Sequence, residues 1–202
     1  MNLANKLTVF RMILVPVFVI IGYLGSFGVI QGTIIGIPMS LFIMNIIFII
    51  ASITDKLDGY IARSRNQVTT FGKFLDPLAD KILVLSALVM LVEYGKLPGW
   101  IPVVVLAREF IVSGYRMPAV EKGGKVIAAS IWGKLKTATT MIAIIVVFFD
   151  KFGFCSFLNT PMAVGEYVLN VIGSVLMIIS VVATIFSGVD YLKGGKEYLK
   201  DN

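Results

Sequence analysis

The sequence predicts an all-α integral membrane protein with six transmembrane helices, and three observations lead to this fold class. Of the 202 residues, 57% are hydrophobic and only 15% are charged, and the mean hydropathy is +0.91. These values lie well outside the composition of soluble globular domains. The hydrophobic residues are collected in six long runs, and nearly all of the charge falls between the runs on one side.

Each run has about the 20 predominantly apolar residues that a bilayer-spanning helix needs. In chain order, the expected helices cover residues 7–23, 37–54, 78–94, 97–117, 132–149 and 164–188. Neither a repeat nor a linker divides them, so we expect one membrane domain over residues 1–202. The first run carries Lys6 and Arg11 at its start, as a signal peptide would, but no Ala-x-Ala-like site follows it. We therefore interpret it as a retained helix.

The connections between the runs predict the orientation. Residues 25–36, 93–100 and 150–166 contain the glycines and prolines that end helices. Of the 18 lysines and arginines, all but Lys96 and Lys151 fall toward the opposite side. Because cytoplasmic connections carry an excess of basic residues, we expect a multi-pass protein of the cell membrane with both termini in the cytoplasm.

Four carboxylates gather in the stretch DKLDGYIARSRNQVTTFGKFLDPLAD, residues 55–80. Asp55 and Asp58 are three residues apart, and Asp76 and Asp80 are four apart, so each pair shares one helix face. Two helical segments can therefore bring the four acids together at the cytoplasmic end of the second and third helices. Four unpaired acids would repel one another, whereas two divalent cations would neutralise them. Oxygen donors in a chain without histidine favour Mg²⁺ or Mn²⁺ over zinc.

Three residues beside these acids suit a diphosphate ligand. Gly59 and Ala62 leave the helix surface open to close approach. Arg63 adds a permanent, forked cation that matches phosphate oxygens. Since paired metals clamp both oxygens of an in-line phosphoryl displacement, the stretch predicts a site for a metal-bound diphosphate.

The same stretch resembles the signature of the CDP-alcohol phosphotransferases, D-x-x-D-G-x-x-A-R followed after eight residues by G-x-x-x-D-x-x-x-D. Every fixed position is met, Gly72 included. The resemblance implies a membrane enzyme, usually a homodimer, that cleaves a CDP-linked donor and passes its phosphatidyl group to an alcohol. It implies that two metals are held by Asp55, Asp58, Asp76 and Asp80, and that Asp80 also accepts the proton of the attacking hydroxyl. It assigns the cytidine diphosphate to Gly59, Ala62, Arg63 and Gly72.

A basic group in the second cytoplasmic region predicts an acceptor that carries a phosphate. Its members are Arg108, Arg116, Lys134 and Lys136, and Glu109 is the one acid beside them. Charges within a spanning helix are costly unless they face partners or water, so they indicate a polar active-site cavity open to the cytoplasm. Two alternatives stay open: Arg108 and Glu109 pair only for assembly, or the basic residues bind anionic lipid headgroups. Lys122 and Lys125 receive no role.

Further segments sharpen the resemblance. AREFIVSGYR (107–116), GKLKTATTM (133–141) and NKLTVFRMILVP (5–16) are similar to segments of bacterial phosphatidylglycerophosphate synthases. Asn5, Thr8 and Arg11 recur every three residues on one face, and we group Thr8 and Arg11 with the nucleotide and diphosphate site. The family often has proline where Ala4 stands here. The resemblance implies phosphatidyl transfer from CDP-diacylglycerol to sn-glycerol 3-phosphate, which yields phosphatidylglycerophosphate and CMP.

Other functions stay open at the level of the sequence. The nearest is the same chemistry with inositol phosphate or phosphatidylglycerol as the acceptor. A membrane prenyltransferase also places aspartates around a metal-bound diphosphate, and dependence on a cytidine nucleotide would exclude it. A divalent-cation transporter could use intramembrane acids, but here the acids gather at one end only. Nucleic-acid binding is not expected, because membrane topology and anionic substrates account for the net charge of +6.

Overall fold

The structure is a computed structural model that describes residues 3–64, 70–121 and 131–195. For residues 3–5, 56–64, 70–77, 115–121 and 194–195 it describes the backbone only. The sequence prediction of a helical protein is confirmed, because the described residues form six long α-helices, one 3-10 turn and a two-stranded hairpin. In chain order these are α1 (Leu3–Ser26), β1 (Thr33–Ile34), β2 (Ile37–Pro38), α2 (Met39–Ser64), α3 (Thr70–Glu93), α4 (Trp100–Glu121), α5 (Ile131–Phe149), η1 (Ser156–Leu158) and α6 (Val164–Gly195).

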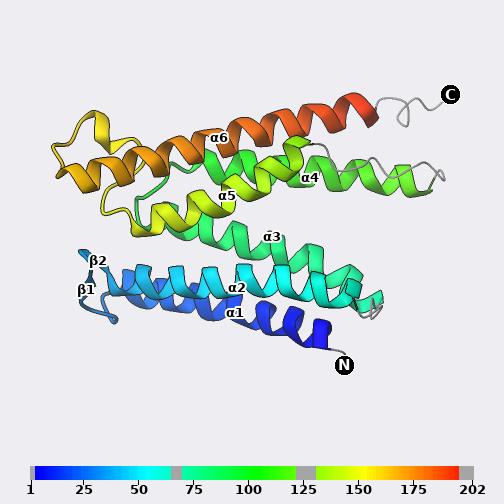
Figure 1. The fold of residues 1–202 in the computed structure, drawn as a ribbon, viewed down its shortest axis with the longest axis horizontal. Helices are drawn as coiled ribbons and strands as arrows, with labels where there is room; N and C mark the ends of the chain where they lie inside the picture. The colour runs from blue at the N-terminus through cyan, green and yellow to red at the C-terminus, as the bar shows by residue number, and fades with distance from the viewer. Residues whose placement is uncertain (1–2, 65–69, 122–130, 196–202) are drawn as a thin grey trace.

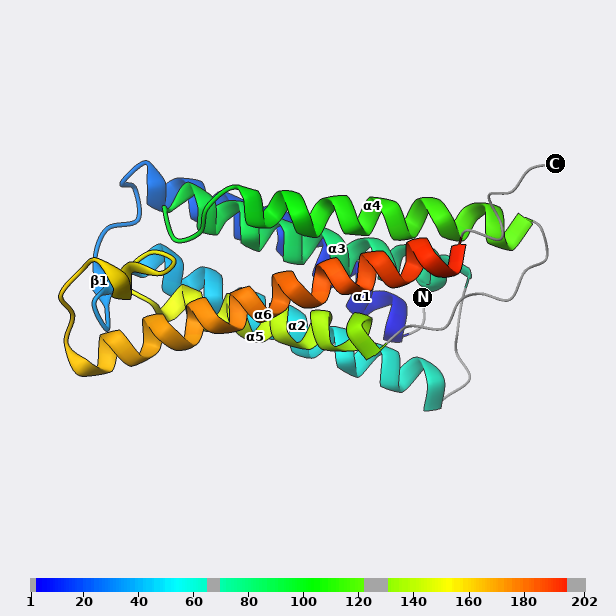
Figure 2. The same cartoon turned by 90° about the horizontal axis from the view of Figure 1, so that it is seen from above.

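The six helices run along one common axis (Figures 1 and 2). The β1–β2 hairpin and the segment between α5 and α6 lie at one end of this bundle, and α1 begins and α6 ends at the other (Figure 1). α1 packs most extensively against α2, and α5 against α6. Within the described residues, three segments are long and apolar enough to cross a membrane, namely Lys6–Ser26, Ile131–Phe149 and Val164–Lys193.

Two helices extend well beyond the apolar runs that predict them. α2 continues to Ser64, past the expected end at residue 54, and α3 begins at Thr70, before the expected start at residue 78. The apolar runs end where the acids begin, but a helix needs only backbone hydrogen bonds to continue, and polar residues can occupy a face that is not in lipid. The acids therefore lie on continuous helices.

The hairpin between α1 and α2 is a feature that the sequence analysis expected only as a turn. Ile34 pairs with Ile37, so Ile35 and Gly36 form a two-residue loop. Both have positive φ, 56° for Ile35 and 78° for Gly36. Two consecutive positive φ angles are typical of a type I′ turn. A β-branched residue is unusual at the first position of such a turn, so the residues Ile35 and Gly36 do not by themselves predict it.

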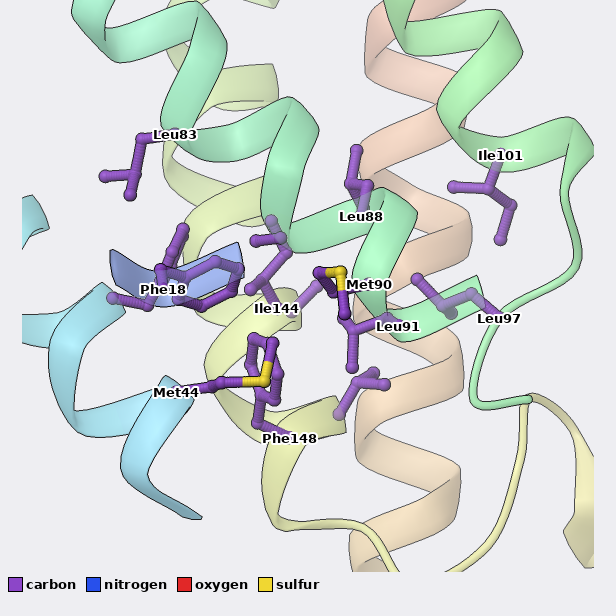
Figure 3. Packing of buried hydrophobic residues seen from close by; sticks show 14 of the residues in the cluster. Phe18, Met44, Leu83, Leu88, Met90, Leu91, Leu97, Ile101, Ile144 and Phe148 are labelled. Carbon is purple, nitrogen blue, oxygen red and sulfur yellow. The ribbon is translucent and has the colours of Figure 1, made fainter. Parts of the chain in front are cut away.

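The centre of the bundle is filled by large apolar side chains. Phe18 of α1 meets the edge of Phe148 of α5 with ring centroids 6.0 Å apart, and Met44 lies beside them (Figure 3). A side chain on Gly22 would collide with Met90 and come within 3.1 Å of the sulfur of Met44. Because lipid tails are as apolar as these side chains, close packing at small residues, not burial itself, is what stabilises such helix pairs.

At the hairpin end, a polar cluster is buried. The ammonium of Lys96 donates to the carbonyl oxygens of Asp150, at 2.8 Å, and Lys151, at 2.7 Å. The Asp150 carboxylate accepts from the amide of Asn170 at 2.5 Å and from the backbone N–H of Phe152 at 3.0 Å. Desolvation lowers the pKa of Lys96 despite the nearby Asp150, and it raises the pKa of Asp150. This cluster ties the α3–α4 connection to the α5–α6 connection.

Candidate active site

Three helices bring a cation and two acids to one point. Arg11 of α1 is fully buried, and its Nη1 atom lies 2.8 Å from Oδ1 of Asp55 on α2 and 2.6 Å from Oδ1 of Asp80 on α3. The side chain of Asp80 is 40% exposed and that of Asp55 is 23% exposed, so Asp80 is the more open of the two acids. The arrangement places two carboxylates from different helices around one positive charge.

This pair of carboxylates fits a divalent cation. The donors are oxygens only, and they already converge on the guanidinium of Arg11 as a cationic centre. The backbones of Asp58 and Asp76 lie one turn from Asp55 and Asp80 on the same helices, but their side chains are outside the described residues. Within the described side chains, no cluster of three potential metal ligands occurs. The donor chemistry of Asp55 and Asp80 thus suits Mg²⁺ or Mn²⁺.

A second charged group is centred on Glu109 of α4. Oε1 of Glu109 lies 2.5 Å from the ammonium of Lys136 on α5 and 3.0 Å from Nη1 of Arg108. Oε2 lies 3.6 Å from the ammonium of Lys81 on α3, which also donates to the hydroxyl of Ser113 at 2.7 Å. One carboxylate therefore faces three cations from three helices.

Arg108 is further anchored by α6. Its Nη2 atom donates to the hydroxyl of Ser187 at 2.5 Å, and its guanidinium lies over the ring of Tyr191, 5.6 Å from the centroid. Gly188 of α6 lies beside this side chain, because a Cβ there would be in ordinary van der Waals contact, 3.6 Å from Cγ of Arg108. The guanidinium is held from two sides, and such an anchored fork presents its donors in a fixed direction.

A single cavity of about 560 Å³ joins the two charged groups. Its polar lining comes from both, and its apolar lining comes from α3, α4 and α5. The lining residues are Asp55, Leu78, Asp80, Lys81, Ile82, Val84, Leu85, Val105, Leu106, Arg108, Glu109, Phe110, Ser113, Lys136, Thr137, Thr140 and Met141. Acids that suit a metal, cations that suit a phosphate and apolar surface that suits an acyl chain thus line one space.

The chain matches the family model described as CDP-alcohol phosphatidyltransferase over residues 1–186. It belongs to this family. As a CDP-alcohol phosphatidyltransferase, it is similar along nearly its whole length to curated relatives. One is the CDP-diacylglycerol--glycerol-3-phosphate 3-phosphatidyltransferase of Bacillus subtilis, 39% identical over 98% of this chain and 97% of the relative. Another is the enzyme of the same name from Haemophilus influenzae, 39% identical over 100% of this chain and 97% of the relative. A probable phosphatidylglycerophosphate synthase of Mycobacterium tuberculosis is 37% identical over 95% of this chain and 80% of the relative.

The structure brings some of the residues singled out in the sequence together and leaves others apart. Asp55, Asp80, Arg108 and Lys136 line the cavity of this phosphatidyltransferase. Arg11 contacts the acids directly, and Thr8 is buried on the preceding turn of α1. Lys134 is exposed and is absent from the cavity lining. The remaining side chains lie outside the described residues: Asp58, Gly59, Ala62, Arg63, Gly72, Asp76 and Arg116.

Lys81, Glu109 and Ser113 line the cavity but are not among the site residues that the sequence predicts. Lys81 directly follows Asp80, and it was counted only toward membrane orientation. Glu109 was noted as an acid among cations, and Ser113 lies one turn further along α4. A signal for Glu109 was present in its position within an apolar helix, because a charge there needs a partner or a function.

Proposed function

We propose that this protein transfers the phosphatidyl group of CDP-diacylglycerol to sn-glycerol 3-phosphate, giving phosphatidylglycerophosphate and CMP. The observation that carries the proposal is the shared cavity, in which Asp55 and Asp80 face the same space as Arg108 and Lys136. An acidic, metal-suited group would take the diphosphate of the donor, and a basic group would take the phosphate of the acceptor. The names and the nearly full-length similarity of the curated relatives support the choice of acceptor.

The proposal includes the membrane topology. All six helices cross the cell membrane as one domain of residues 1–202, and the cavity opens at the cytoplasmic face. The distribution of basic residues supports this orientation, because Lys96 and Lys151 are the two that fall at the hairpin end. The acyl chains of the donor stay in the bilayer. Assembly as a homodimer is also part of the proposal and rests on the family resemblance.

Asp55, Asp58, Asp76 and Asp80 would hold two divalent cations, Mg²⁺ or Mn²⁺. When bound, such cations neutralise the diphosphate and stabilise the charge that develops on departing CMP. Gly59, Ala62, Arg63 and Gly72 would surround the cytidine diphosphate, and Thr8 and Arg11 are assigned to the same site. Arg11 orients the carboxylate of Asp80 through the contact at 2.6 Å.

The acceptor side completes the reaction. Arg108 and Lys136 hold the phosphate of glycerol 3-phosphate, with Arg116 and Lys134 as further candidates from the sequence. The free hydroxyl then approaches Asp80, which accepts its proton as a general base. The hydroxyl oxygen forms a bond to the phosphorus nearest the lipid as the bond to CMP breaks. No histidine is available for this proton transfer, so a carboxylate is the suitable base.

The test is release of CMP from CDP-diacylglycerol by the purified protein with Mg²⁺. Glycerol 3-phosphate, serine, inositol phosphate and phosphatidylglycerol are compared as acceptors. We expect turnover with glycerol 3-phosphate and background release with the others. Turnover with a different acceptor would contradict the acceptor assignment and leave the donor side intact, whereas no CMP with any acceptor would contradict the whole proposal.

A further inference from the structure

Glu109 lies at the centre of the basic group. Its negative charge would repel an anionic ligand, whereas the cations around it would attract one. Its carboxylate has ammonium or guanidinium groups at 2.5 Å, 3.0 Å and 3.6 Å. Its side chain is 17% exposed, and it lines the cavity together with all three cations. A carboxylate in this position either competes with an anionic ligand for the cations or holds the cations in place for that ligand.

The environment of Lys136 indicates that Glu109 holds the cations in place. Lys136 is 8% exposed, and the carboxylate of Glu109 lies 2.5 Å from its ammonium. A buried cation that loses its partner is strongly disfavoured. Three cations from α3, α4 and α5 would also repel one another without an acid between them. Glu109 thus makes their convergence possible.

The three cations keep N–H donors that a ligand can use. A lysine ammonium has three donors and a guanidinium has five. Lys81 uses one on Ser113, and Arg108 uses one on Glu109 and one on Ser187. Nε of Arg108 is buried, and in the part of the chain that the structure describes it has no hydrogen-bond partner. The three cations retain more donors than Glu109 can accept.

We propose that Glu109 is the positioning residue of the acceptor site, and that it holds Lys81, Arg108 and Lys136 around one point where a phosphate monoester binds. This inference rests on the proposed function and extends it, since it adds Lys81 as a third phosphate-binding cation and gives the one acid a role. Glu109 itself does not contact the reacting atoms. It acts through the three cations, so its removal changes binding of the acceptor more than the chemical step.

The experiment uses Glu109→Gln, which keeps the shape of the side chain and removes its charge. We expect KM for glycerol 3-phosphate to rise roughly tenfold or more, because charged hydrogen bonds are weakened. KM for CDP-diacylglycerol should stay within about twofold, and kcat should fall less than KM rises. Glu109→Asp should recover part of the loss. The matched control is Glu166→Gln, which removes a carboxylate 2.5 Å from Lys151 at the opposite end of the bundle and should leave both KM values unchanged.

An unchanged or lower KM for glycerol 3-phosphate in Glu109→Gln would overturn the proposal, since a carboxylate that merely occupies the site would bind in competition with the acceptor. Equal losses for both substrates would overturn it too. A second readout is independent of turnover: inorganic phosphate should raise the Tm of the unaltered protein and not that of Glu109→Gln. If the unaltered protein releases no CMP with glycerol 3-phosphate, the proposed function fails, and the phosphate-dependent Tm still decides the role of Glu109. If Glu109→Gln does not fold, the same measurements on Glu109→Asp decide.

Discussion

Lys96 and Lys136 are both buried lysines, 7% and 8% exposed, but they lie at opposite ends of the bundle and have different partners. Lys96 donates to two backbone carbonyl oxygens, which are fixed by the chain itself. Lys136 contacts one carboxylate that it shares with Arg108 and Lys81 beside a cavity. A buried cation satisfied by backbone atoms joins structural segments, whereas one that shares a carboxylate with other cations beside a cavity retains donors for a ligand.

The same contrast holds for the acids. Asp150 accepts hydrogen bonds from Asn170 and from a backbone N–H, and it is 3% exposed. Asp80 is 40% exposed in its side chain and faces the cavity. Changes at the hairpin end should therefore alter stability, and changes at the cavity end should alter activity. The following three predictions test this division.

The largest effect is expected for Asp80→Asn. Loss of the proposed base and metal ligand should lower kcat roughly thousandfold, in the middle of the range for removal of a general base. The measurement is CMP release at saturating substrates. The fold should persist, since Arg11 keeps its contact with Asp55. Activity within a few-fold of the unaltered protein would assign the base to another residue.

Arg11→Met should affect both stability and activity, because Arg11 is buried between the two acids. Removing one partner of a buried ion pair costs about 3–5 kcal/mol, and two neighbouring carboxylates would then repel each other. We expect a lower Tm in detergent that added Mg²⁺ partly restores, since a divalent cation can replace the missing positive charge. Arg11→Lys serves as the charge-conserving control. A Tm loss that Mg²⁺ does not change would contradict the metal assignment.

The smallest effect is expected for Lys96→Met, and it should be visible only in stability. Loss of two hydrogen bonds from a charged donor should cost on the order of 2 kcal/mol, with kcat and KM unchanged.

The pH dependence of stability gives a sharper criterion. Because the pKa of Lys96 is lowered in the folded protein, the unfolded chain binds more protons as pH approaches the ordinary value of 10.5, so stability rises with pH there. Lys96→Met should reduce this rise in Tm measured from neutral to alkaline pH.

The sequence predicts the helices well, because they depend on local periodicity, and of the four acids the described side chains test only Asp55 and Asp80. The spacing of three and four residues puts the aspartates on helix faces, and the structure brings Asp55 and Asp80 to one cation. The sequence places Arg11 in the nucleotide and diphosphate site, but it does not predict that Arg11 contacts these acids directly. Arg11 is separated from Asp80 by 69 residues, and only the packing of α1 against α2 and α3 brings them together.

The basic group is predicted less well by the sequence. Lys134 and Lys136 were treated together, yet two residues on a helix are about 200° apart, so only Lys136 faces the cavity. The sequence analysis does not include Lys81 in this group, because Lys81 directly follows Asp80 at the end of the acidic stretch. The anchoring of Arg108 by Ser187 and Tyr191 depends on the contact between α4 and α6, which no local pattern in the sequence encodes.

The order of the charges along the chain has a consequence for biogenesis. Arg11 precedes Asp55 and Asp80, and Lys81 precedes Glu109. Since a chain is synthesised from its N-terminus, each of these acids emerges from the ribosome after the cation that it contacts in the folded protein. A carboxylate of this set can therefore be neutralised as soon as its helix inserts beside those already in the bilayer, which lowers the cost of placing it there.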